Sequence, residues 1–150
     1  MQFLAGKELY IVRCSIRHLT QNGLNVASST NGGHAFINDS LIAFNTGGVN
    51  VQGTANIASI KNTSILSNTS FAVRANGANN IVRVQASVLN ASPTGISLLN
   101  GGTAGSVGPS NFVTGAGGAV TKRKRDEKNS EKQLSHVPRI QRDPPGPRNR

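Results

Sequence analysis

The 150-residue sequence has little of what large cores and catalytic sites are usually built from. It has no Trp, one Tyr, one Cys and six acidic residues. A single cysteine forms no internal disulfide, and no apolar run approaches the roughly 20 residues of a transmembrane helix. The first residues also lack the apolar run of a secretory signal. Gly is frequent instead, with 17 residues, and Asn, Ser and Thr are common, which favours short strands and tight turns.

The positive charge is divided unevenly along the chain. Residues 1–121 hold six Lys or Arg and two acids, a net of +4, whereas residues 122–150 hold ten and four, a net of +6. The second segment begins Lys122-Arg123-Lys124-Arg125 and ends rich in Pro and Arg. It has few apolar residues to offset the entropy lost on ordering. We therefore predict a folded domain over 1–121 and a disordered basic tail over 122–150.

The predicted domain contains an internal repeat. An apolar residue follows a Ser four times and an Asn once, at steps of 25, 24, 23 and 24 residues: Ile16, Leu41, Ile65, Val88 and Phe112. A second set recurs at steps of 25, 22 and 25 residues: Leu24, Val49, Phe71 and Ile96. Apolar and small residues alternate around both sets, as in strands with one buried face. Asn and Gly separate the sets and mark turns.

A chain that coils with a fixed period places like residues above one another, whereas strands of a sandwich occupy unequal environments. Helical repeats are a poorer explanation, because Gly and β-branched residues disfavour helix. We therefore predict an all-β fold, a right-handed parallel β-helix of about four to five coils. One inward column is predicted to consist of Ile16, Leu41, Ile65 and Val88 from the first set. The second set is predicted to form another.

The repeat resembles the bacterial right-handed parallel β-helix proteins of the pectate-lyase-like superfamily. The resemblance covers about residues 3–120 and is carried by coil phrases such as Phe3-Leu4-Ala5-Gly6, Gly48-Val49-Asn50-Val51 and Ser110-Asn111-Phe112-Val113. It implies a parallel β-helix that is extracellular or part of the cell envelope. Family members are typically longer, so the resemblance also implies a truncated member. The motifs are structural and imply no particular activity.

Catalytic chemistry has few candidate residues in the predicted domain. Glu8 and Asp39 are its only carboxylates, and paired-carboxylate glycoside hydrolysis needs two within about 5–10 Å. A calcium site needs several oxygen ligands. We expect Asp39 to lie in a turn or on the surface, and we predict no catalytic, metal or cofactor site.

The remaining candidates have a simpler structural explanation. His18 and His34 lack an evident companion for a metal site or a triad, and both are expected on the outside of a coil. Cys14, placed in the column of Asp39 and Thr63, is expected to be a buried or half-buried structural thiol without a base nearby.

Three functions remain open. The first is a non-catalytic structural or recognition module that presents a surface to a polysaccharide or a cell-surface protein. Basic residues such as Arg83 and Lys61 would bind an anionic glycan only if they share a face. The second is a fragment of a polysaccharide lyase or hydrolase whose active site lies on missing coils. The third is nucleic-acid association through residues 122–125, although the tail has no aromatic residue for base stacking. Open coil ends also favour self-association. We favour the first.

Overall fold

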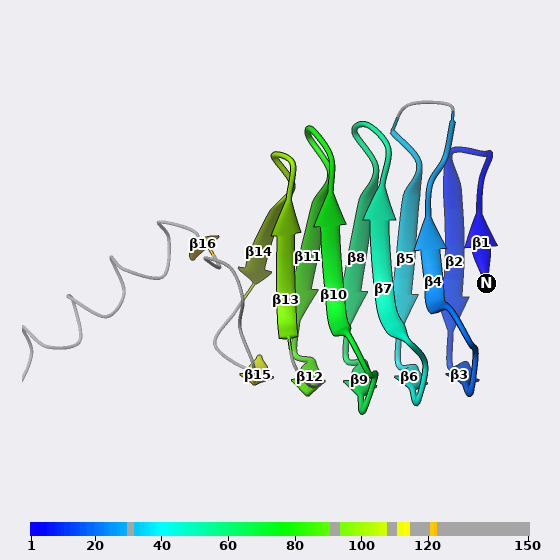
Figure 1. The fold of residues 1–150 in the computed structure, drawn as a ribbon, viewed down its shortest axis with the longest axis vertical. Coiled ribbons are helices and arrows are strands. Elements are labelled where there is room, and N and C mark those ends of the chain that lie inside the picture. The colour runs from blue at the N-terminus through cyan, green and yellow to red at the C-terminus, as the bar shows by residue number, and fades with distance from the viewer. Residues whose placement is uncertain (30–31, 91–93, 108–110, 115–120, 123–150) are drawn as a thin grey trace, which may run out of the picture.

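The computed structural model describes residues 1–29, 32–90, 94–107, 111–114 and 121–122, and in these ranges the chain is a parallel β-solenoid of about four turns. Three sheets run side by side along the axis, and each coil adds one strand to each sheet (Figure 1). The described residues contain no helix, and so none that is long and apolar enough to cross a membrane. The all-β prediction is confirmed.

Strands of the same sheet lie one coil apart in the sequence. Sheet A contains β1 (Gln2–Phe3), β4 (Asn22–Val26), β7 (Gly47–Gln52), β10 (Phe71–Asn76) and β13 (Thr94–Leu99). Sheet B contains β2 (Glu8–Val12), β5 (His34–Asn38), β8 (Ile57–Lys61), β11 (Ile81–Gln85), β14 (Thr103–Val107) and β16 (Thr121–Lys122). Sheet C contains β3 (Ser15–Arg17), β6 (Leu41–Ala43), β9 (Ser64–Leu66), β12 (Val88–Asn90) and β15 (Phe112–Thr114).

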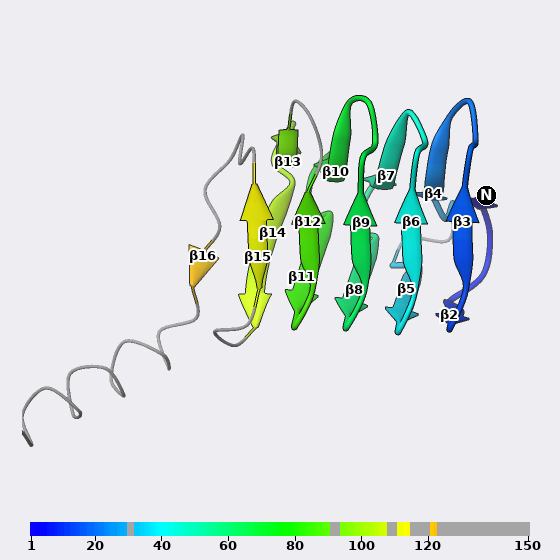
Figure 2. The same cartoon turned by 90° about the horizontal axis from the view of Figure 1, so that it is seen from below.

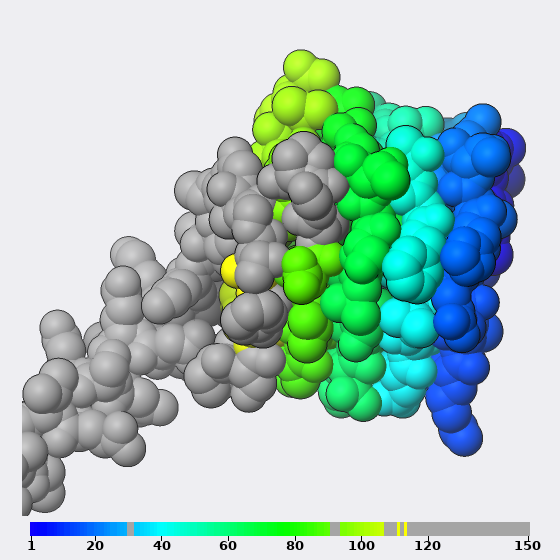
Figure 3. Space-filling model, turned by 60° about the horizontal axis from the view of Figure 1, so that its bottom comes forward, coloured from blue at the N-terminus to red at the C-terminus, as the bar shows by residue number. Residues whose placement is uncertain are grey.

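Every strand pair is parallel, so each coil repeats the orientation of the one before it. Figure 2 shows the three-residue strands of sheet C forming one side of the stack, and Figure 3 shows the coils as adjacent bands. The chain rises through sheet A in front, descends through sheet B behind and returns through sheet C as it moves away from the N-terminus (Figure 1). This path is right-handed, as predicted. Of the predicted tail, only Lys122 lies in the described residues, in β16.

One predicted inward column is partly wrong. The Cα register pairs Ile16 with Ile42, Ile65 and Leu89 in successive coils, and the last three are fully buried. Leu41 and Val88 instead share a register with Ser15 and Ser64, and Val88 is 37% exposed. Phe112 occupies the same register as Val88. A shift of one residue moves a strand residue to the opposite face, so Leu41 and Val88 point outward and Ile42 and Leu89 fill the core.

The column predicted in sheet A needs one correction. Leu24, Val49 and Ile96 are buried on the inward side as expected, but their partner in the third coil is Val73 rather than Phe71. Phe71 pairs with Gly47 and covers it, since a Cβ on Gly47 would meet the Phe71 ring. The columns of sheet B complete the core: Ile11, Ile37, Ile60 and Val84 in one, and Leu9, Ala35, Ala58, Val82 and Ala104 in the other.

Each corner between sheets combines a left-handed residue with a polar ladder. At the corner from sheet B to sheet C, the residues with positive φ are Arg13, Asp39, Asn62 and Ala86. The residue after each of these donates its backbone N–H to the side-chain oxygen of the equivalent residue in the following coil. The resulting ladder runs through Cys14, Ser40, Thr63, Ser87 and Asn111. Buried backbone groups that turn away from a sheet need such partners, so these short polar residues hold the corners in register.

Candidate functional site

The outer side of sheet B gathers more of the candidate residues than any other part of the described chain. Alternation along β2 sends Leu9 and Ile11 into the core and leaves Glu8 and Tyr10 outside. The register then aligns two outer rows along the axis. The first row is Glu8, His34, Ile57, Ile81 and Thr103, and the second is Tyr10, Phe36, Ser59, Arg83 and Gly105. We call these two rows the sheet B face.

An aromatic stack forms the N-terminal half of the sheet B face. The Tyr10 and Phe36 rings are nearly parallel, at 9°, with centroids 4.8 Å apart. The His34 ring stacks on Phe36 from the neighbouring row, with centroids 3.8 Å apart. Tyr10 is 61% exposed, although an aromatic side chain of this size usually covers a core. The stacked rings of Tyr10 and Phe36 cover one face of each other, so the aromatic surface open to solvent is mainly that of Tyr10.

Polar groups border this aromatic surface. The Tyr10 hydroxyl donates to Glu8 Oε2 at 2.8 Å, and this hydrogen bond, with burial and the Glu8 charge, raises the pKa of Tyr10. His34 Nε2 and Ser59 Oγ lie 2.8 Å apart. Burial, followed by the positive charge of Arg83, lowers the pKa of His34, and Glu8 opposes this shift. The imidazole is therefore favoured in its neutral form, which can accept a hydrogen bond from the Ser59 hydroxyl or donate one to it, depending on the tautomer.

The contact of His34 with Ser59 corrects the expectation that His34 has no companion. A nucleophilic triad contains a serine and a histidine in hydrogen-bond contact of this kind. The acidic residue that would orient His34 in a triad is not in place. The nearest carboxylate, Glu8, accepts from the Tyr10 hydroxyl and makes no hydrogen bond with His34 among the described residues. The face is also open, whereas acyl transfer depends on donors arranged around an oxyanion.

The two carboxylates of the domain are not brought together. Glu8 pairs with His34 at the start of β5, and Asp39 follows the end of that strand. Five residues of strand separate the two positions by about 16 Å, more than paired-carboxylate chemistry allows. Asp39 lies in a turn as predicted, where Asn62 Nδ2 donates to it at 2.6 Å. No group of three or more His, Cys, Asp and Glu side chains within the described ranges is arranged to hold a metal ion.

The predictions for His18 and Cys14 have different outcomes. His18 lies exposed at a corner, as expected, and stacks on Phe44 with centroids 5.3 Å apart. Cys14 is exposed rather than buried, and its register partner is Ser40 rather than Asp39. It is the first member of the corner ladder in the described residues. Its Sγ contacts Val12 O at 3.4 Å, as the Ser40 hydroxyl contacts Asn38 O at 2.7 Å.

The basic residues of the domain are spread over the solenoid. Arg83 lies on the sheet B face, and Lys61 lies at the end of β8 on the same side. Arg13 is at a corner, Arg17 is on β3, and Arg74 is on sheet A with its guanidinium 3.9 Å from the centre of the Phe71 ring. No single face therefore collects the positive charge of the described domain.

Sequence reasoning missed the aromatic stack because it aligned sheets A and C and left sheet B unaligned. Tyr10 and Phe36 are 26 residues apart, which is close to the period of the other sets. This spacing was the available signal. Comparisons with protein-family models, with curated proteins and with solved structures find no match to this chain.

Proposed function

We propose that the chain is a non-catalytic recognition module whose sheet B face binds a glycan. The observation that carries the proposal is the exposed Tyr10 ring, lying parallel to Phe36 within a border of polar side chains. The C–H groups of a sugar ring carry partial positive charge and pack on the negative face of an aromatic ring. The sugar hydroxyls then reach the carboxylate of Glu8, the hydroxyl of Ser59 and the guanidinium of Arg83.

The solenoid supports binding of a long polymer. Positions in each outer row repeat every strand spacing, about 4.8 Å, along a straight axis. The backbone that carries these side chains is held by hydrogen bonds between successive strands. Little backbone entropy is therefore lost when a ligand binds. A polysaccharide lying along the axis would contact several coils at once. The family resemblance, with its implied extracellular location, agrees with such a partner and remains a prediction.

Hydrolysis by Ser59 and His34 is the second candidate function, because their 2.8 Å contact is a specific observation in its favour. We rank it below recognition because the removal of a triad orienter or an oxyanion donor typically costs a factor of about 10² to 10⁴ in rate. A fluorophosphonate probe that labels the wild type but not Ser59→Ala would favour catalysis. We expect no labelling of Ser59. Neither the lyase fragment nor nucleic-acid association is favoured by an observation in the described residues.

Affinity electrophoresis through gels containing single polysaccharides tests the proposal. We expect the full chain to be retarded by at least one of cellulose derivatives, xylan, mannan, chitosan and pectin. Tyr10→Ser should abolish the retardation, whereas Phe44→Asn should keep it. Phe44 is a matched control because it is 52% exposed and aromatic but lies away from sheet B, at a corner position with positive φ, which Asn tolerates. Equal retardation of both variants, or no retardation by any polymer, would contradict the proposal.

A further inference from the structure

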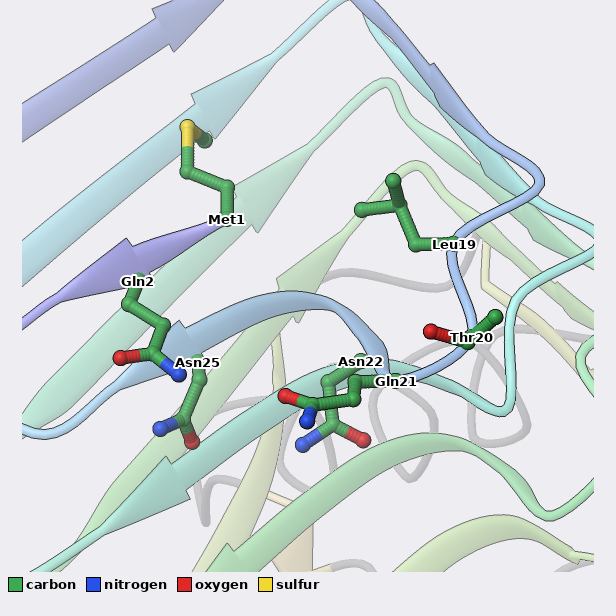
Figure 4. A pocket seen from close by; sticks show the side chains of 7 residues that line it. All are labelled: Met1, Gln2, Leu19, Thr20, Gln21, Asn22 and Asn25. Carbon is green, nitrogen blue, oxygen red and sulfur yellow. The ribbon is translucent and has the colours of Figure 1, made fainter.

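A pocket on the outer side of sheet A has a lining unlike that of the sheet B face. It lies at the N-terminal end of the sheet and has a volume of about 250 Å³ (Figure 4). The lining residues are Met1, Gln2, Leu19, Thr20, Gln21, Asn22 and Asn25. Four of the seven are primary amides, and the only charged group that contributes is the N-terminal ammonium. That ammonium already donates to Gly23 O at 3.0 Å.

The two sides of the pocket differ in chemistry. Figure 4 shows the apolar side chains of Met1 and Leu19 on one side and the amides of Gln2 and Asn25 together on the other. Met1 is 46% exposed and Leu19 is 37% exposed, so both offer apolar surface to a ligand. The amides of Gln21 and Asn22 lie close to each other near the centre of the same view. The pocket is therefore amphipathic.

Most of the hydrogen-bonding capacity of these amides is unused. The side chains of Gln2, Gln21 and Asn22 make no hydrogen bond with any part of the chain that the structure describes. Asn25 uses its Oδ1, which accepts from Asn50 Nδ2 at 2.8 Å. This bond fixes the Asn25 amide and leaves its Nδ2 donors available. Each free primary amide offers two donors and one acceptor.

Asn50, in the next coil, lies behind the pocket and holds the Asn25 amide in place. It is only 6% exposed, and its Nδ2 also donates to Gln52 Oε1 at 2.9 Å. Its Oδ1 is buried and accepts no hydrogen bond among the described residues. The neighbouring Arg74 on the same row has a buried Nε that likewise lacks a partner. Neither Asn50 nor Arg74 lines the pocket, so the amides within reach of a ligand are those of Gln2, Gln21, Asn22 and Asn25.

We propose that this pocket is a second binding site, which takes a neutral, hydroxyl-rich ligand of the size of one sugar ring. A hydroxyl group donates and accepts at once, which matches the free amides that line the pocket, whereas an oxyanion only accepts and would leave the amide oxygens without a donor. The apolar side of a sugar ring packs against Met1 and Leu19. The pocket is on a different sheet from Tyr10 and Phe36, so this site is independent of the proposed function of the sheet B face.

NMR titration of the full chain, with the side-chain amide resonances of Gln2, Asn25 and Asn50 as probes, tests this site. The ligands are the methyl glycosides of glucose, galactose, mannose and xylose, with glycerol and sulfate as controls. We expect at least one glycoside to shift these resonances saturably. Asn25→Leu should weaken that binding about tenfold, the equivalent of 1.4 kcal/mol. Tyr10→Ser should leave it unchanged.

The outcomes separate the two sites. Loss of pocket binding in Tyr10→Ser would contradict an independent site, as would binding that survives both Asn25→Leu and Gln21→Leu. Equal shifts with glycerol, or stronger binding of sulfate than of any glycoside, would overturn the ligand class. If no glycoside shifts the amide resonances, the pocket is not a sugar site, whatever the polysaccharide gels show for the sheet B face.

Discussion

Asn45 and Asn68 occupy the same corner in successive coils, and the backbone N–H of Asn45 donates to Asn68 Oδ1 at 3.0 Å. The Asn45 side chain donates to the same oxygen at 3.2 Å, and Asn68 Nδ2 donates to Ile42 O at 3.3 Å. Both side chains are at least 98% buried. Similar ladders run through the other two corners, with Asn56 and Asn80 at the one from sheet A to sheet B. The solenoid is thus held by polar side chains at its corners as well as by its apolar columns.

Asn68→Ala should therefore destabilise the domain. It removes the acceptor of a buried backbone N–H and the donor to a buried carbonyl, and an unsatisfied buried group costs about 1–3 kcal/mol. The measurement is thermal unfolding followed by circular dichroism. Thr69→Ala is the control, because Thr69 is exposed and its side chain makes only a long contact of 3.5 Å. Equal melting temperatures for the two variants would mean that the ladder contributes nothing.

The corrected register of sheet C predicts opposite effects for two adjacent residues. Ile42→Asp should unfold the domain, since it buries an unpaired charge in a core position that is 0% exposed. Leu41→Asp should be tolerated, because that side chain points outward. Ile65→Asp should behave like Ile42→Asp. A folded Ile42→Asp protein beside an unfolded Leu41→Asp protein would restore the register first predicted from the sequence.

The register of sheet C shows which features of the fold can be predicted from the sequence and which cannot. The period, the parallel coils and the identity of Ile16 and Ile65 as core residues follow from the recurrence of apolar positions. The exact register within sheet C does not follow, because the dipeptide of Ser and an apolar residue occurs at two different positions of the coil. Ser15 and Ser64 are on outer strand positions, whereas Ser40 and Ser87 belong to the corner ladder. Since Leu41 and Ile42 are both apolar, hydrophobicity alone cannot distinguish them.

The candidate site was less accessible from the sequence. The inward residues of sheet B are similar from coil to coil, but the outer rows change type along the axis, from Tyr10 and Phe36 to Ser59 and Arg83. Function on an outer face does not require repetition, so beyond the 26-residue spacing of Tyr10 and Phe36 periodicity carries little information about it. Contacts such as that of His34 with Ser59 join residues 25 apart and follow only from the exact register.

A glycine of sheet A should tolerate no side chain. A Cβ on Gly48 would collide with the Ala72 carbonyl oxygen and the Ile65 side chain, and the carbonyl is held by the sheet. Gly48→Ala should therefore cost about 1–3 kcal/mol, as overpacked cores do. Gly105→Ala is the matched control, because a Cβ there meets no atom within 4 Å. Chemical denaturation of both variants gives the comparison, and an unchanged midpoint for Gly48→Ala would contradict the close approach.

Stability should depend on pH through His34. Its pKa is lowered in the folded domain by burial and by Arg83, so the unfolded chain binds the proton more readily. Stability should then fall as the pH drops below about 6.5, the ordinary value for histidine, and stop falling once the folded-state pKa is passed. Denaturation of the wild type and His34→Gln between pH 8 and 5 would isolate this dependence. Parallel curves for the two proteins would show that His34 contributes none.

Tyr10 provides the most direct measurement of the central claim, because the chain has one Tyr and no Trp, and intrinsic fluorescence therefore reports on this residue alone. The full chain would be titrated with the polysaccharide that retards it most in affinity electrophoresis. If the Tyr10 and Phe36 surface is the binding site, tyrosine emission changes saturably, with a midpoint equal to the one for retardation. A polysaccharide that is bound while tyrosine emission stays constant would place recognition elsewhere on the solenoid and contradict the account.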